Sequence, residues 1–157
     1  SLINLRIIGC GKFLRPIVKN GLLTGKIFSM AKSFLSRQIK KAAQLFHLGE
    51  YAITHESLER EQIEAVQGVP AEAFVRVQAA YYDAHIVVAD DLTQVEAWPI
   101  IIHEVAHIKY AHLAHIIEQC WKAKPRLNWA QARRLIDAEF EKLCEKDVSL
   151  VIKNSRR

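Results

Sequence analysis

The sequence has few of the residues that would cross-link a small domain or anchor it in a bilayer. Its three cysteines, Cys10, Cys120 and Cys144, lie far apart and form no CxxC pair, which argues against a disulfide framework and a four-cysteine zinc site. No apolar run reaches the roughly 18 to 20 residues that span a bilayer. We therefore expect a cytoplasmic protein without a transmembrane segment.

Acidic residues are missing from the first 49 positions, which hold nine of the 22 lysines and arginines. All 17 acidic residues follow, together with the other 13 basic ones, so the excess positive charge is N-terminal. We interpret residues 1–29 as a basic extension and residues 30–157 as a single folded domain. Such an extension could contact nucleic acid or another acidic partner, because this binding depends on charge rather than on fold.

Three segments have apolar residues at helical spacing. The first predicted helix covers residues 31–48 and is expected to end at Gly49. A second begins with Pro99, a residue suited to the first turn of a helix, and runs to about residue 122. A third covers residues 129–153. The chain therefore has a helix at its start and a pair of helices at its end.

Between these helices the sequence favours short strands. Alternation or short apolar runs predict strands over residues 51–58, 74–77 and 85–89, with a loop through Gly68 and Pro70 after the first strand. Strands that cluster between helices, rather than alternating with them, are typical of α+β domains. We expect a small antiparallel or mixed sheet.

The segment HEVAH, residues 103–107, brings two imidazoles and a carboxylate into an apolar helix. Each helical residue advances about 100° and about 1.5 Å, so His103 and His107 lie on one face, one turn apart. Neutral imidazoles suit zinc, and Glu104 is placed to act on water rather than to coordinate alongside both histidines. We therefore predict His103 and His107 as zinc ligands and Glu104 as the general base.

The alternative is that His103 and His107 are core histidines bonded to neighbouring side chains. Burying them beside a carboxylate would cost free energy unless a shared ligand or partners satisfied them, which favours the metal.

A catalytic zinc site needs a third protein ligand. His112 lies about 180° round the helix from His103, and His115 lies about 18 Å further along it, so neither can join the same ion. The last helix offers Glu139 and Glu141 on the two margins of its apolar stripe, and an aspartate, Asp147, that points toward the stripe.

Four segments within about residues 38–152 resemble the gluzincins, and more closely the short gluzincin-like zinc metallopeptidases common in phages and prophages. HLGEYAI is similar to an early strand of that group, AHIVVADD to the strand before the motif helix, HEVAH to its metal motif and EKLCEK to its ligand helix. The resemblance implies a minimal zincin-like fold, bound Zn²⁺ and Glu141 as the third ligand. It also aligns Glu145 with a residue that bonds a ligand histidine in the family.

The same resemblance implies a zinc-dependent peptidase that acts on protein or peptide substrates. In gluzincins the strand before the motif helix binds substrate backbone as an added strand, which would bring HIVVA, residues 85–89, to the substrate. An alternative from another class is a non-catalytic metal-binding or phage structural module that retains the fold and contacts nucleic acid through its basic segment.

Overall fold

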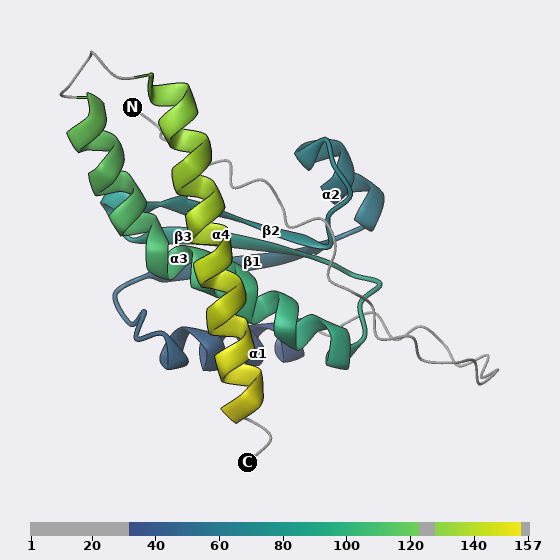
Figure 1. Ribbon diagram of the computed structural model, residues 1–157. Helices are drawn as coiled ribbons and strands as arrows, with labels where there is room; N and C mark the ends of the chain where they lie inside the picture. The colour runs from purple at the N-terminus through teal and green to yellow at the C-terminus, as the bar shows by residue number, and fades with distance from the viewer. Residues whose placement is uncertain (1–31, 123–127, 155–157) are drawn as a thin grey trace.

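A mixed three-stranded sheet and four α-helices make up the computed structural model, which describes residues 32–122 and 128–154 (Figure 1). This confirms the predicted α+β class. The predicted basic extension, residues 1–29, lies outside the described residues. The elements in chain order are α1 (Lys32–Leu45), β1 (Ala52–Leu58), α2 (Arg60–Gln67), β2 (Ala73–Gln78), a 3₁₀ turn (Ala79–Tyr81), β3 (Asp83–Ala89), α3 (Gln94–Lys122) and α4 (Trp129–Asn154).

The strand order of the sheet is β1-β3-β2, with β3 parallel to β1 and antiparallel to β2. Every residue of β3 pairs with β1, and residues 83–88 also pair with β2. The backbone of HIVVA is therefore hydrogen-bonded on both sides, and the expectation that it binds substrate as an added strand is wrong. Within the described part of the chain, the free edges of the sheet belong to β1 and β2.

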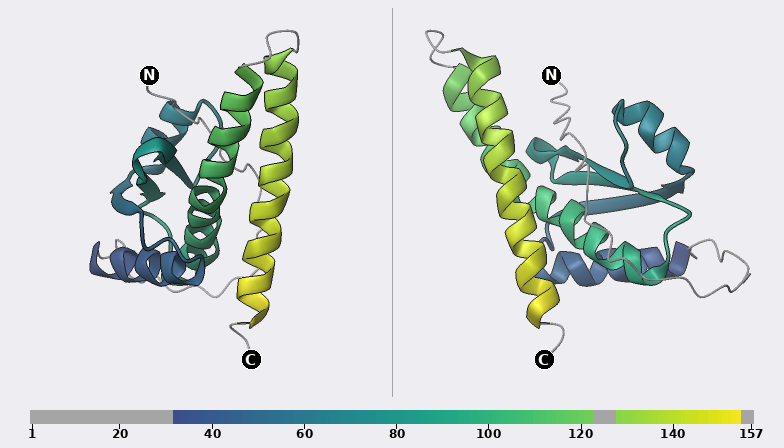
Figure 2. Two further views of the ribbon diagram at one scale, coloured as in Figure 1. Left: turned by 90° about the vertical axis from the view of Figure 1, so that its left-hand side faces the viewer. Right: turned by 45° about the vertical axis from the view of Figure 1, so that its right-hand side comes forward.

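Helix α3 lies between the sheet and α4, and Figure 2 shows the three as successive layers. Apolar residues occur on most sides of α3 in its middle, because the sheet, α1 and α4 all pack against this helix. Ile101, Ile102 and Val105 are fully buried there, in one core with Ile86 and Val88 of β3. Burial of each such side chain stabilises the fold by about 2 kcal/mol.

The first helix buries one stripe and ends differently from the prediction. Leu35, Ile39 and Ala42 recur at helical spacing and are buried against the core. The helix does not end at Gly49, because His47 already adopts a left-handed conformation with φ of 56°. The N–H of Leu48 then bonds the carbonyl of Ala43 at 2.9 Å, an arrangement that closes a helix C-terminus.

Helix α3, which carries the HEVAH motif, begins five residues before Pro99. The proline therefore lies inside the helix rather than at its start. Thr93 and Glu96 explain the earlier start: the Thr93 hydroxyl accepts the Glu96 N–H at 3.3 Å, and the Glu96 carboxylate accepts the Thr93 N–H at 3.0 Å. This reciprocal cap satisfies two N–H groups of the first turn. The proline is tolerated at the loss of one backbone hydrogen bond.

Helix α2 occupies a segment that we expected to be a loop. Its start is capped by Glu59 and Gln62, whose side chains bond each other's backbone N–H groups, and its end by Gly68 at φ of 72°. Ile63 is its only buried residue. With eight residues the helix is shorter than the stretch over which apolar periodicity becomes informative, so the sequence pattern did not reveal it.

Helices α3 and α4 form an antiparallel pair (Figure 1). Helix α4 buries Ala132, Cys144 and Val148, whereas Leu143 is 38% exposed. The carboxylate oxygen Oε2 of buried Glu118 on α3 lies 3.8 Å from the guanidinium nitrogen Nη1 of Arg133 on α4. Among the described residues, no helix combines the length and the apolar character needed to cross a membrane.

Candidate metal centre

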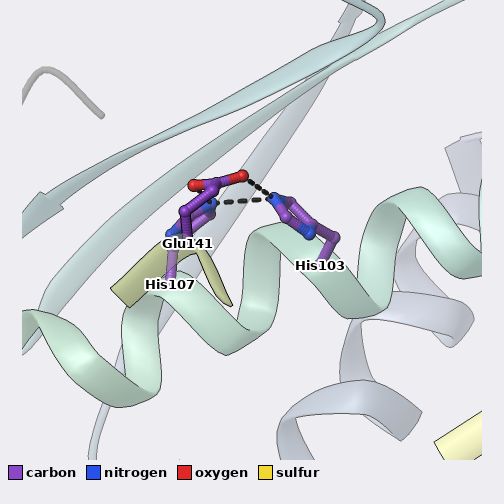
Figure 3. Close-up of side chains that lie close together, drawn as sticks. All are labelled: His103, His107 and Glu141. Atoms are coloured by element: carbon purple, nitrogen blue, oxygen red, sulfur yellow. Dashed lines mark hydrogen bonds and ion pairs between the residues drawn. The ribbon is translucent and has the colours of Figure 1, made fainter. Parts of the chain in front are cut away.

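His103, His107 and Glu141 meet where α4 crosses the middle of α3. The two imidazoles project from successive turns of α3, and Glu141 reaches them from α4 (Figure 3). One ligand atom from each lies within 4.8 Å of the others, and both histidines are buried. Within the described ranges this is the one group of three or more such side chains that could hold a metal ion.

The donor atoms are close enough to share one ion. Nε2 of His103 lies 3.0 Å from Nε2 of His107 and 3.1 Å from Oε1 of Glu141, and Nε2 of His107 lies 3.5 Å from Oε2 of Glu141. Around a tetrahedral zinc with bonds of about 2.0 to 2.2 Å, ligand atoms are separated by about 3.3 to 3.6 Å. Two imidazole nitrogens and a carboxylate group at these separations fit a zinc ion with little movement.

The other two acidic candidates for a third ligand have different partners. The Glu139 side chain is 69% exposed and pairs with Lys142 at 2.6 Å. Asp147 accepts hydrogen bonds from Lys109 at 2.8 Å and from the Tyr110 hydroxyl at 2.9 Å. Of the three carboxylates considered from the sequence, Glu141 is the one that reaches the histidines.

Glu104 is buried next to the histidine pair, with 6% of its surface exposed. Burial raises the pKa of this carboxyl to about 7, and the charge of Glu141 adds to the rise while His103 opposes it. A carboxyl with a pKa near neutrality can take up and release a proton near pH 7, which suits a general base.

The two histidines differ in their electrostatic surroundings. Burial and the neighbouring His103 lower the pKa of His107 to about 4, so its ring is neutral near pH 7. Burial also lowers the pKa of His103, but the hydrogen bond to Glu141 and the charges of Glu104, Glu141 and Glu145 outweigh it, so the net shift is upward. Glu145, which the resemblance aligned with a histidine-bonding residue, thus acts on His103 through its charge.

Cys144 is a neighbour of the site that the sequence reasoning did not assign. Its Sγ lies 3.3 Å from Nδ1 of His107, the ring nitrogen that faces away from Glu141. Its place three residues after Glu141 puts both on one face of α4, and this spacing was a usable signal.

Two other histidines, His112 and His85, have partners away from this site. His112 stacks on Tyr82 with ring centroids 5.6 Å apart, and the ring nitrogens of His85 contact Thr54 and Glu56 on the sheet. As expected from helical geometry, His112 and His115 are not part of the three-residue group.

No protein-family model, curated protein or solved structure matches this chain.

Proposed function

We propose that this chain is a zinc-dependent peptidase in which His103, His107 and Glu141 hold the metal and Glu104 is the general base. The observation that carries the proposal is the meeting of the Glu141 carboxylate with both imidazoles, 3.1 Å and 3.5 Å from their Nε2 atoms, beside a buried glutamate. Three protein ligands from two helices leave one coordination position for solvent, which is typical of catalytic zinc sites.

Bound zinc would acidify a water molecule and polarise the peptide carbonyl that the water attacks. Glu104, buried beside the ligand histidines, accepts the proton of that water and passes it to the departing amine. His103 and His107 both belong to α3. This one buried helix therefore fixes the position of each imidazole relative to the other. Glu141 completes the set with a negative charge.

We also propose that the fold is of the minimal zincin type. The arrangement of a small sheet, a motif helix packed on it and a ligand helix packed on the motif helix supports this proposal. The sequence resemblance to phage-type gluzincins contributes the substrate class, namely peptide bonds in proteins or peptides.

The test compares wild type with Glu104→Gln, using zinc analysis and a quenched fluorescent, unfolded protein substrate. We expect one zinc per chain in both proteins, because glutamine leaves the three ligands intact, and a loss of turnover of at least about 100-fold in the variant. Glu118→Gln is the matched control, since Glu118 is also a buried glutamate of α3 but pairs with Arg133, away from the histidines.

Two results would reject the peptidase. A Glu104→Gln protein as active as wild type would exclude Glu104 as the base. Stoichiometric zinc with no cleavage of any unfolded protein would instead favour a non-catalytic metal-binding module.

A further inference from the structure

The same turn of α4 that supplies Glu141 also supplies a thiol to the far side of His107. Cys144 is fully buried, and its Sγ lies 3.3 Å from Nδ1 of His107. The contact is within the distance at which an imidazole N–H bonds sulfur. This contact involves Nδ1, the ring nitrogen that would stay free if a metal were bound at Nε2.

The hydrogen-bond roles of the groups in the site limit where its protons can lie. The carboxylate of Glu141 only accepts hydrogen bonds, so His103 donates through Nε2, which lies 3.1 Å from Oε1. That N–H is the only proton His103 Nε2 can carry and it is engaged with Glu141, so the 3.0 Å separation of the two Nε2 atoms does not by itself assign a proton to either ring. A metal bound at Nε2 of His107 requires the neutral ring to carry its proton on Nδ1, and Sγ of Cys144, 3.3 Å from Nδ1, is placed to accept that proton.

We propose that Cys144 is a positioning residue that holds His107 in the Nδ1–H tautomer, with the Nε2 lone pair directed at the metal. The partner of the second ring nitrogen sets which nitrogen of a histidine can bind metal and how the ring is oriented. Cys144 acts through His107 rather than as a ligand, because its sulfur lies on the opposite side of the ring from Nε2. The part of this inference that concerns metal affinity rests on the proposed function.

The first test measures Zn²⁺ affinity by competition with a chromogenic chelator. Cys144→Ala and Cys144→Val should bind Zn²⁺ about 10- to 100-fold more weakly than wild type, because both remove the acceptor while valine keeps the space filled. Cys144→Ser keeps an oxygen acceptor and should stay within about threefold of wild type. Cys120→Ala, at an exposed cysteine of α3, is the control and should leave the affinity unchanged.

Two outcomes of this measurement would overturn the proposal. One is Zn²⁺ binding within threefold of wild type in both the alanine and the valine variants. The other is a serine variant as weak as the valine variant, because the acceptor would then be irrelevant.

The second test needs no metal and detects the tautomer directly. Long-range ¹H–¹⁵N spectra of metal-free protein at pH 7 should show His107 protonated at Nδ1 in wild type, and a loss of that preference in Cys144→Val. A wild-type ring protonated at Nε2, or an unchanged tautomer in Cys144→Val, would overturn the inference. If wild type binds no Zn²⁺, the proposed function fails, and the tautomer measurement alone decides the role of Cys144.

Discussion

Glu141 and His103 belong to different helices, yet the carboxylate oxygen Oε1 lies 3.1 Å from the imidazole nitrogen Nε2. This contact exists only while α4 is packed on α3, because nothing within either helix brings the two groups together. A metal held by both helices would therefore bind the folded state and not the unfolded chain. Metal binding and helix packing are expected to stabilise each other.

The first prediction follows from this coupling. Zinc present at about 100 times its dissociation constant should raise the free energy of unfolding by about 2.7 kcal/mol, because the ion binds the folded state selectively. Urea unfolding with zinc and with a chelator measures the difference. His103→Asn should remove the effect of zinc. An identical unfolding midpoint with and without bound zinc would contradict the proposed site.

The second prediction separates two glutamates that are two residues apart on α4. Glu141→Ala should weaken zinc binding by more than about 100-fold, since it removes a direct ligand and not merely a neighbour of one. Glu139→Ala should leave the affinity unchanged, because that side chain is 69% exposed and pairs with Lys142. Chelator competition measures both. Equal effects in the two variants would show that Glu141 does not bind the ion.

The third prediction concerns two residues held in the left-handed backbone region, His47 at φ of 56° and Tyr82 at φ of 53°. His47→Gly should raise the free energy of unfolding by about 0.5 to 1 kcal/mol, because glycine adopts this conformation without strain and the His47 side chain is exposed. Urea unfolding checks the change.

Tyr82→Gly is the matched comparison for that change. It relieves the same backbone strain but removes a ring that packs edge-on against Tyr51 and stacks on His112. Net destabilisation of about 1 kcal/mol or more is expected, because aromatic contacts and buried area are lost. Equal stabilisation in both glycine variants would show that the aromatic contacts contribute nothing.

Strand positions and the long helices could be predicted from the sequence because they depend on local periodicity. The order of the strands could not, since alternation says which residues are extended and nothing about which strand lies at the centre. The assignment of residues 85–89 to substrate failed for this reason. β3 is flanked on both sides, and only the assembled sheet reveals that.

Helix boundaries failed where side chains, rather than apolar repeats, decide them. Pro99 favours a helix start, but the reciprocal hydrogen bonds of Thr93 and Glu96 begin α3 earlier. The short α2 went unnoticed because its eight residues span little more than two turns, and its ends are defined by the caps at Glu59 and Gly68.

The sequence by itself determined the histidine pair, because the rotation of about 100° per residue brings His103 and His107 to one face of any helix they share. Helix geometry left Glu139, Glu141 and Asp147 open as partners, and although the resemblance implied Glu141, only the tertiary structure shows which carboxylate meets the histidines. Glu139 and Glu141 point about 160° apart on α4, and burial of Cys144 and Val148 against α3 sets the rotation that turns Glu141 inward. Side-chain packing between two helices, which no local pattern contains, thus assembled the three-residue group.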